Sequence, residues 1–301
     1  MRILISGATG LVGSALANAL RAAGHAVTSL VRPGGRVDAG DLRWDPARGT
    51  IEAEAMEGAD AVIHLGGASI ASGRWNAARK ELLRSSRVDS TRLLVNSMAR
   101  MRRKPRVFLC ASAIGIYGNR GDEILTEASA PGTDFLSGVA CEWEAEASRA
   151  AASGIRTVLL RFGVILAADG GALPRMAMPF RFGVGGRLGS GQQWISWVAL
   201  EDAVGAAQAA LAVERLSGPV NVVAPGAARN VEFTRVLAHV LHRPAIFPAP
   251  AFALRLALGE MADALLLISQ RVEPQRLRAA RYAFRHAELE PALRAILKRS
   301  E

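Results

Sequence analysis

The first half of the chain alternates short apolar runs with longer segments that repeat apolar residues at helical spacing. Residues 3–5 form a brief run suited to a strand buried on both faces, and residues 11–23 have helical periodicity up to Gly24, a typical helix-ending residue. The pattern continues to residue 162. Further strands are predicted at 26–31, 61–65, 106–111 and 157–162, and further helices at 77–103 and 142–151.

This order predicts an α/β fold with a doubly wound parallel sheet, because parallel strands need a crossover, usually a helix, between them. Residues 1–167 are expected to form this Rossmann-type domain. From residue 168 the sequence is rich in glycine and then in proline, which predicts a smaller C-terminal lobe over 168–301. Within that span, residues 195–224 are expected to return to the sheet domain. Two more helices are predicted, at 254–268 and 289–297.

Composition excludes several classes of protein. Half of the 301 residues are hydrophobic, which is enough for a continuous core. No apolar run reaches the roughly 20 residues of a membrane-spanning helix, so no membrane partner is expected. The two cysteines, Cys110 and Cys141, cannot build a disulfide framework, which favours a reducing, cytoplasmic compartment. The five histidines lack metal-ligand spacing, and no metal site is predicted.

The formal net charge of +10 is the unusual bulk property. It is typical of nucleic-acid binders and also of enzymes that take phosphorylated or acidic ligands. The densest basic cluster, residues 100–106, lies at the end of a predicted helix, where cations are favourable and Pro105 stops the helix. No aromatic residue interleaves with it to stack bases. A small-molecule ligand is therefore expected, and a nucleic acid is not.

A glycine loop, Gly7-Ala8-Thr9-Gly10-Leu11-Val12-Gly13, follows the first predicted strand and opens the first helix. Gly7 permits a tight turn, Gly10 lets backbone amides approach a pyrophosphate, and Gly13 lets the helix pack close to the strand. A purely structural loop is the alternative, but strand, loop, helix and second strand all fall where dinucleotide binding needs them. The predicted cofactor-binding residues here are Gly7, Thr9, Gly10, Leu11, Val12 and Gly13.

The end of the second predicted strand indicates which dinucleotide is bound. An acidic residue there would bind the ribose 2′-hydroxyl and repel a 2′-phosphate. The strand ends instead at Leu30-Val31-Arg32, without a carboxylate. Arg32, with Arg36 as a second candidate, is placed to hold the 2′-phosphate, whereas the alternative for Arg32 is an ordinary surface arginine. NADP is therefore predicted in preference to NAD.

A series of short motifs runs along essentially the whole chain. Together with the glycine spacing, DAVIHLGG at 60–67 resembles the extended short-chain dehydrogenase/reductases, also called the NAD-dependent epimerase/dehydratase family. The remaining motifs resemble one atypical branch of it, the epimerase family proteins. They are GRW at 73–75, SRV at 86–88, SAIGIYG at 112–118, DFL at 134–136, WE at 143–144, GSGQQW at 189–194, GEMAD at 259–263 and SQRV at 269–272.

The resemblance implies a Rossmann domain that binds NADP, a small C-terminal lobe, and oxidoreductase or epimerase-like activity on a small molecule. It is compatible with a homodimer. In the family the cofactor is also contacted after the second strand, at a later Leu-Gly turn and by an arginine. These contacts correspond here to Arg32, to Leu65 and Gly66, and to Arg87. The alternative for Arg87 is an exposed helix residue.

The usual catalytic set of this superfamily is missing. Its tyrosine and lysine stand four residues apart on one helix face, but the chain has no Y-x-x-x-K. Alignment through WE at 143–144 places Ser137 and Cys141 at these two positions. Tyr117 and Ser112, which follow the strand predicted at 106–111, are the candidate catalytic residues. The alternative for both is packing within the loop, and Tyr117 would need a cationic neighbour to act as a base.

Three functions stay open after these observations. An NADP-dependent oxidoreductase or nucleotide-sugar-epimerase-like enzyme is favoured. The second is an NADP-binding regulatory protein without catalysis, for example one related to cell division, which the missing catalytic set supports. A nucleic-acid binder is the least favoured. The stretch 170–191 is expected to border the substrate pocket, with Gln192, Gln193 and Trp194 as contacts.

Overall fold

The computed structural model describes residues 1–298, so the end of the predicted second lobe, residues 299–301, lies outside the described residues. An eight-stranded sheet forms the centre of the larger domain, and its neighbouring strands pair in parallel except for β3 with β4. The prediction of a doubly wound parallel sheet is confirmed. In spatial order the strands are β12 (Gly218–Val222), β8 (Arg156–Phe162), β6 (Val107–Ala113), β5 (Ala61–His64), β1 (Arg2–Ser6), β2 (Ala26–Val31), β3 (Leu42–Asp45) and β4 (Thr50–Ile51).

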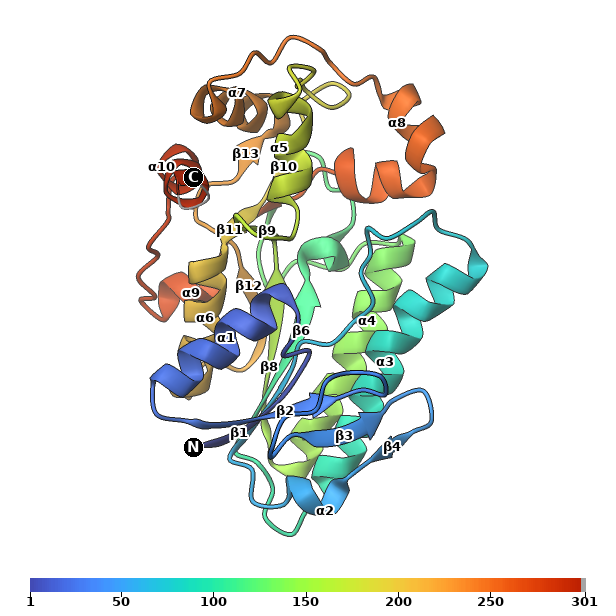
Figure 1. The fold of residues 1–301 in the computed structure, drawn as a ribbon, viewed down its shortest axis with the longest axis vertical. Coiled ribbons are helices and arrows are strands. Elements are labelled where there is room, and N and C mark those ends of the chain that lie inside the picture. The colour runs from blue at the N-terminus through green and yellow to red at the C-terminus, as the bar shows by residue number, and fades with distance from the viewer. Residues whose placement is uncertain (299–301) are drawn as a thin grey trace.

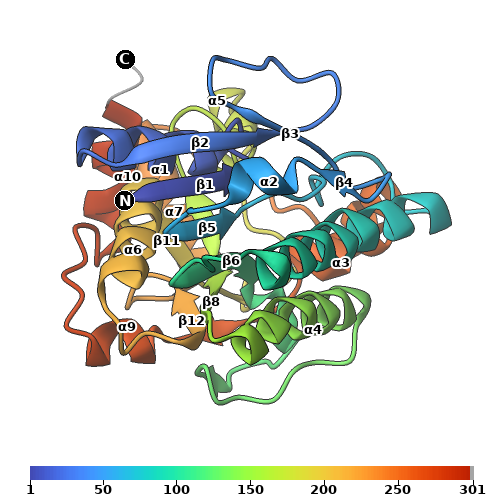
Figure 2. The ribbon, with the colours of Figure 1, turned by 90° about the horizontal axis from the view of Figure 1, so that it is seen from below.

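Helices cover both faces of the sheet (Figure 1 and Figure 2). One face packs against α1 and α6, and the other against α3 and α4. Successive strand residues point to opposite faces, so Ile3 and Ile5 enter the first core and Leu4 enters the second. This is why β1 reads as an uninterrupted apolar run. The helices are α1 (Leu11–Ala22), α3 (Ala77–Arg100), α4 (Phe135–Ser148) and α6 (Leu200–Ala212).

A smaller second lobe stands over the carboxyl ends of the strands (Figure 1). Its core packs Trp197, Phe233 and Leu293, each at most 1% exposed. The chain enters this lobe after β8, returns through α6 and β12, and enters it again. Its elements are β9 (Val164–Leu166), α5 (Leu173–Arg181), β10 (Trp194–Ile195), β11 (Trp197–Ala199), β13 (Ala228–Arg229), α7 (Asn230–Leu241), α8 (Ala251–Leu258), a π-helical turn (Ala262–Leu266) and α10 (Leu289–Lys298).

The remaining elements are short connectors. Helix α9 packs beneath β12, where Leu277 joins the first sheet core, and β7 pairs in parallel with β14. No described helix combines the length and apolar character needed to cross a bilayer. The connectors are α2 (Ala53–Met56), two 3₁₀ turns (Ile114–Tyr117 and Arg149–Ser153), β7 (Ile124–Leu125), β14 (Arg271–Val272) and α9 (Gln275–Ala279).

Three differences from the predicted elements have local causes. The expected loop after β2 contains β3, in which Leu42 and Trp44 are buried while the residues between and after them are not. Helix α4 begins seven residues before the predicted position, because Asp134 accepts a hydrogen bond from the Ser137 amide at 2.9 Å and caps the helix. The helix predicted at 254–268 is interrupted at Gly259, whose φ of +62° is left-handed.

Candidate functional site

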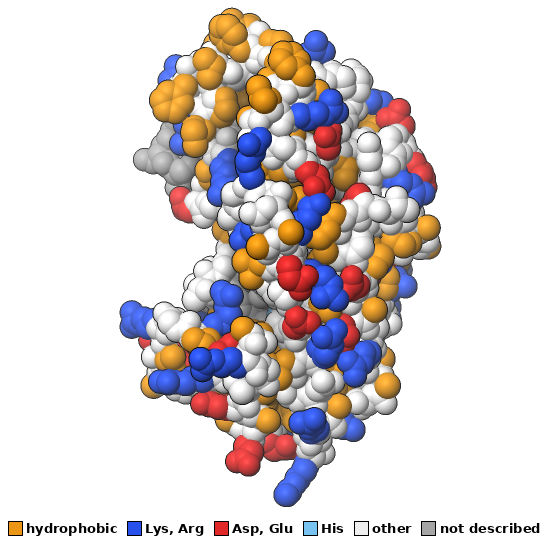
Figure 3. All heavy atoms as spheres, turned by 90° about the vertical axis from the view of Figure 1, so that its right-hand side faces the viewer, with side chains coloured by type: hydrophobic (Ala, Val, Ile, Leu, Met, Phe, Trp, Pro, Cys, Tyr) orange, Lys and Arg blue, Asp and Glu red, His pale blue; other side chains and the backbone are white. Residues whose placement is uncertain are grey.

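The carboxyl ends of β1, β2, β5 and β6 share one edge of the sheet, beneath the second lobe. The strand order reverses at β1, with β2 and β3 on one side and β5, β6 and β8 on the other. In open α/β sheets, ligands bind in the crevice at such a switch point. Figure 3 shows the surface hollowed between the sheet domain below and the second lobe above. The loops at this edge therefore form the candidate site.

The glycine loop between β1 and α1 is packed so tightly that positions 7 and 13 have no room for a side chain. Gly7 has a φ of +76°, and a Cβ there would lie 2.8 Å from the carbonyl carbon of Leu65. A Cβ on Gly13 would lie only 2.0 Å from the carbonyl oxygen of Gly7. The first contact places the loop against the turn after β5, and the second places the first turn of α1 against the loop.

The first turn of α1 leaves backbone donors free for a ligand. Its N-cap is Gly10, no side chain caps it, and the first turn has no acidic residue. The amides of Leu11, Val12 and Gly13 have no partner within the helix, because the first N–H groups of any helix lack one. Thr9 and Gly10 are exposed at the mouth of the loop. Uncapped amides at the positive end of a helix suit a pyrophosphate, so this cradle fits a dinucleotide.

Arg32 directly follows β2 and is exposed. No acidic side chain among residues 1–298 forms an ion pair with it, whereas the nearby Arg36 pairs with Asp38 at 3.0 Å. A cavity of about 450 Å³ lies beside Arg32 and is also lined by the buried Trp44 and by Arg43, Asp45 and Glu52. A cation without a partner beside a cavity at the end of β2 is suited to bind an added phosphate.

The turn after β5 is held by Arg87 from α3. The Leu65 amide donates to the Ser6 carbonyl at 3.1 Å, and the Arg87 guanidinium donates to the Ala68 carbonyl at 3.0 Å. A Cβ on Gly67 would lie 3.2 Å from the guanidinium carbon of Arg87. Burial, and then the charge of Arg79, lowers the pKa of Arg87 to about 10. Arg87 is therefore a partly buried support of the turn that contains Leu65 and Gly66.

His64 lies at the end of β5 beneath this turn and is fully buried. Its Nδ1 is 2.5 Å from the Ser6 hydroxyl, and its Nε2 is 3.0 Å from the Ser90 hydroxyl. Burial, with a smaller contribution from the charge of Arg87, lowers the pKa of His64 to about 3. The imidazole is thus neutral at pH 7 and has both nitrogens engaged. It ties β5 to β1 and α3.

Tyr117 and Ser112, the two candidate catalytic residues, belong to a buried network. The Tyr117 hydroxyl donates to Asn221 at 2.7 Å and accepts from Arg161 at 2.9 Å, and the ring is fully buried. Ser112 donates to Glu144 at 2.6 Å and is 3% exposed. Burial raises the pKa of Tyr117, although Arg161 acts to lower it. A catalytic role for either side chain stays a prediction, and this burial does not favour it.

The network is centred on an ion pair that sequence reasoning missed. Arg161 of β8 donates to both carboxylate oxygens of Glu144 of α4, at 2.8 and 2.7 Å. Burial would lower the pKa of Arg161, but the hydrogen bonds and charge of Glu144 outweigh it and raise the pKa. The sequence signal that could have revealed this ion pair was Arg161, the single charged residue in the strand predicted at 157–162. Such a residue needs a buried anion.

The positions of the missing tyrosine and lysine offer no acid–base pair. The Ser137 hydroxyl donates to the Gly115 carbonyl at 3.1 Å and is buried. Cys141, one turn further along α4, is partly exposed, and burial followed by the charge of Glu144 raises the pKa of its thiol. A thiol with a raised pKa is a weak nucleophile. These two residues pack α4 against the 3₁₀ turn after β6.

The three residues expected to contact substrate in the second lobe make internal contacts. Gln193 donates to the carbonyls of residues 188 and 266 at 3.1 and 3.0 Å. The oxygens of Gln192 accept from Arg229. The guanidiniums of Arg229 and Arg271 lie 4.7 and 4.6 Å from the ring centroid of Trp194. A substrate contact by these residues stays a prediction.

The chain matches known proteins along nearly its whole length. Residues 3–224 match the model of the NAD dependent epimerase/dehydratase family, and residues 249–296 match a domain of unknown function, DUF1731. Epimerase family protein MT2273 of Mycobacterium tuberculosis is 42% identical over 291 residues, which are 97% of this chain and 96% of the relative. Epimerase family protein YfhF of Bacillus subtilis is 37% identical over 300 residues, 99% and 98% of the two chains.

Solved structures give the same relationship. The crystal structure of human epimerase family protein SDR39U1 (isoform 2) with NADPH has a TM-score of 0.89 and 32% identity, covering 99% of both chains. A UDP-glucuronic acid 4-epimerase from Bacillus cereus in complex with NAD has a TM-score of 0.78 at 16% identity, covering 99% of this chain and 98% of that one. The second likeness concerns the fold alone.

Proposed function

Because the chain belongs to the NAD dependent epimerase/dehydratase family, within the NAD(P)-binding short-chain dehydrogenase/reductases, we propose that it binds NADP and acts as an oxidoreductase or epimerase-like enzyme on a small molecule. The observation that carries the proposal is the cradle at the start of α1. Gly7 and Gly13 leave no room for a Cβ, and no side chain caps the amides of the first turn. When bound, the nicotinamide supplies a carbon that donates or accepts a hydride.

The choice of NADP rests on the end of β2. Arg32 is exposed beside a cavity whose lining also includes Asp45 and Glu52. The strand β2 itself ends without the acidic residue that would bind the ribose 2′-hydroxyl and repel a 2′-phosphate. The human relative with 32% identity was crystallised with NADPH, which agrees with this choice. In this arrangement the amides of α1 hold the pyrophosphate, Arg32 holds the 2′-phosphate, and Arg87 keeps the turn of Leu65 and Gly66 against the loop.

This chain differs from the usual members of its superfamily in the side chains available to exchange a proton with the substrate. With Ser137 and Cys141 at the tyrosine and lysine positions, no side chain there exchanges a proton readily near pH 7. Loss of a positioned acid or base typically lowers a rate by about 10² to 10⁴. The expected activity therefore depends mainly on holding cofactor and substrate together.

A second candidate function follows from the same observation. A protein that keeps the dinucleotide cradle but lacks the tyrosine–lysine pair is equipped to sense NADP without turning it over. In that case NADPH binds tightly but is not oxidised by any carbonyl compound.

The decisive experiment compares NADPH and NADH binding by calorimetry in the wild type and in Arg32→Ala. The variant should lose at least tenfold in NADPH affinity and little in NADH affinity, because a charge-assisted hydrogen bond contributes about 1.5–3 kcal/mol. Arg36→Ala is the matched control, since Arg36 lies in the same loop but is paired with Asp38. Equal losses for both cofactors would contradict the choice of NADP, and no heat with either would contradict the proposal itself. Screening NADPH oxidation against carbonyl compounds then separates the enzyme from the sensor.

A further inference from the structure

Six large apolar side chains are exposed at the end of the second lobe that points away from the sheet domain. Each of them is between 54% and 78% exposed. Together they present on the order of 700 Å² of apolar surface, above the roughly 300–600 Å² of the largest patch on a typical monomer. Figure 3 shows hydrophobic side chains gathered over this end of the molecule. We call this surface the apolar tip, and it consists of Phe182, Val184, Ile246, Phe247, Phe252 and Leu256.

Backbone contacts bring the parts of the apolar tip together. The Phe247 amide donates to the Gly185 carbonyl at 3.1 Å, and the Gly189 amide donates to the Ala249 carbonyl at 2.8 Å. The loop that follows α5 therefore runs beside the segment that leads into α8, at the upper end of Figure 1. Because the exposed apolar residues come from this loop, this segment and α8, they form one surface.

Helix α8 has an apolar sequence but is not packed into the protein. Seven of its eight residues are apolar, and none of the eight is buried. Phe252 and Leu256 stand four residues apart on one face of the helix and are 72% and 78% exposed. An apolar helix normally buries at least one face against its own protein. The outward face of α8 therefore indicates a contact with something outside this chain.

The apolar tip has basic and no acidic surroundings. The two stretches of chain that contain it, residues 173–191 and 242–258, hold five arginines and no Asp or Glu. Of these arginines, only Arg255 forms an ion pair among the described residues, with Asp263 at 2.9 Å. Arg181, Arg187 and Arg243 are exposed. Their charge is therefore available to an anionic surface.

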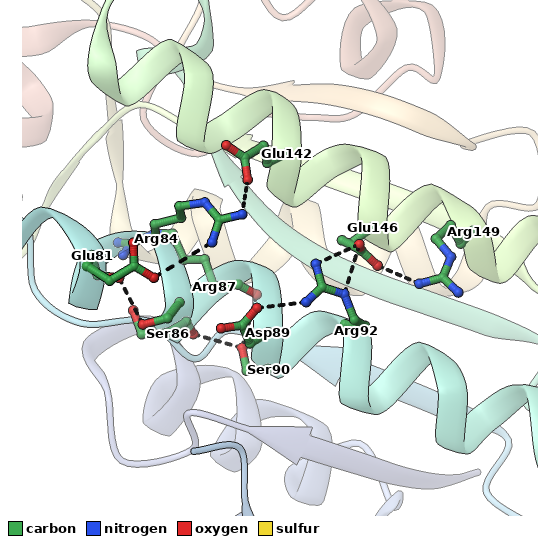
Figure 4. Close-up of polar contacts among 11 residues, drawn as sticks. Glu81, Arg84, Ser86, Arg87, Asp89, Ser90, Arg92, Glu142, Glu146 and Arg149 are labelled. Atoms are coloured by element: carbon green, nitrogen blue, oxygen red, sulfur yellow. Dashed lines mark hydrogen bonds and ion pairs between the residues drawn. The ribbon is translucent and has the colours of Figure 1, made fainter. Parts of the chain in front are cut away.

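The arginines on α3 and α4 are arranged differently. Arg84 pairs with Glu142 at 2.6 Å, and Arg92 pairs with Glu146 at 3.0 Å (Figure 4). Paired charges of opposite sign attract an external anion only weakly. The second lobe thus differs from this face, because it combines unpaired arginines with exposed apolar side chains.

We infer that the apolar tip inserts into the surface of a bilayer that contains anionic lipids, while Arg181, Arg187 and Arg243 contact the lipid headgroups. Apolar side chains that enter the boundary between headgroups and acyl chains, flanked by cations, are typical of proteins that lie on a membrane. A second copy of the chain suits the tip less well, because a two-fold interface would bring the same arginines close to one another. This inference departs from the expectation of no membrane partner, which rested only on the absence of a spanning segment.

Flotation of the full chain with lipid vesicles tests the inference. Vesicles of equal parts phosphatidylglycerol and phosphatidylcholine should bind the protein, less strongly as salt rises, and phosphatidylcholine alone should bind little. Phe252→Ser and Leu256→Ser should each lower the partition coefficient about fivefold or more, because each removes apolar surface that leaves water. Leu82→Ser is the matched control and should bind like the wild type, since Leu82 is 47% exposed in α3, outside the tip.

A second pair of variants tests the contribution of charge. The double variant Arg181→Gln with Arg243→Gln should weaken binding to the anionic vesicles about tenfold or more. Arg102→Gln with Arg106→Gln removes the same charge from exposed positions that precede β6, at the opposite edge of the sheet from the second lobe. This control should weaken binding much less. All the substituted side chains are exposed, so thermal unfolding should confirm that every variant is folded.

Several results would overturn the inference. Absence of binding to the anionic vesicles at millimolar lipid removes the membrane contact. Equal losses in Leu82→Ser and Leu256→Ser show that the tip is not the contact, and equal losses in the two double variants show that total charge alone attracts the protein. A dimer in analytical ultracentrifugation that Phe252→Ser abolishes assigns the tip to a second copy. None of these measurements requires a nucleotide, so they test the inference independently of the proposed function.

Discussion

Arg161 and Glu144 form a two-point ion pair in the interior, with side chains only 8% and 11% exposed. Ser112 and Tyr117 complete its hydrogen bonds, so both charges are compensated. Glu144→Gln should destabilise the fold by about 3–5 kcal/mol, because removing one partner leaves a buried charge without compensation. Chemical denaturation measures this change in the free energy of unfolding. Glu290→Gln, which breaks the exposed pair with Arg294, is the control and should change little.

Substitution by alanine should have opposite effects on stability at two helical glycines, Gly13 and Gly138, because only Gly13 lies close to another part of the backbone. Gly13→Ala should abolish NADPH binding and destabilise the fold, because its Cβ would lie 2.0 Å from a backbone oxygen. Gly138→Ala in α4 meets nothing within 4 Å and should stabilise the protein by about 0.4–1 kcal/mol. Calorimetry measures the affinity for NADPH, and thermal unfolding measures the stability of both variants. A Gly13→Ala protein with normal NADPH affinity would contradict the packing described for the cradle.

His64 predicts a loss of stability in mild acid. Its pKa falls from 6.5 to about 3 on folding, chiefly through burial. Above pH 6.5 the ring is neutral in both states and contributes no pH dependence. Below that value the unfolded chain binds a proton that the folded chain refuses, so unfolding should become easier by about 1.4 kcal/mol per pH unit.

His64→Gln should remove this contribution from the slope of unfolding free energy between pH 6 and pH 4. His242→Asn is the matched control, because His242 is exposed at the end of α7 and asparagine accepts its left-handed backbone. An unchanged slope in His64→Gln would show that the buried ring does not resist protonation.

Tyr117→Phe distinguishes packing from catalysis. The variant leaves Asn221 and Arg161 each without one buried partner, so it should lose about 1–3 kcal/mol of stability. Turnover of any substrate found by the carbonyl screen should stay within a few-fold at temperatures where the variant is folded. A loss of 10² or more in kcat without a loss of stability would support the catalytic role instead.

The sheet domain could be predicted because its signals are local. The apolar run at 3–5, the glycines at 7–13 and the helical periodicity that follows are each readable within a few residues, and the structure repeats them in the same order. Strand β3 was not predicted, because only Leu42 and Trp44 are buried in it. Two apolar positions are too few to show the alternation of apolar and polar residues that is typical of a strand.

The chemistry of the site was harder to predict because it depends on contacts between distant segments. The sequence placed Tyr117 in a loop, where its hydroxyl would be free to contact a substrate. In the structure this hydroxyl donates a hydrogen bond to Asn221, which lies 104 residues away in the chain. The Arg32 position could be named from its distance along the chain after Gly13. The contact of Arg175 with the loop after β5 could not be predicted, because Arg175 reaches Ala71 only once the second lobe has folded over the sheet.

The repeated passage of the chain between its two parts restricts how they move. A part tethered by one peptide can rotate freely, whereas here the chain passes between the two parts after β8, before α6, after β12, and both before and after α9. Because several covalent connections join the two parts, rotation of one against the other would strain these connections. The two walls of the hollow in Figure 3 are therefore expected to keep their relative orientation.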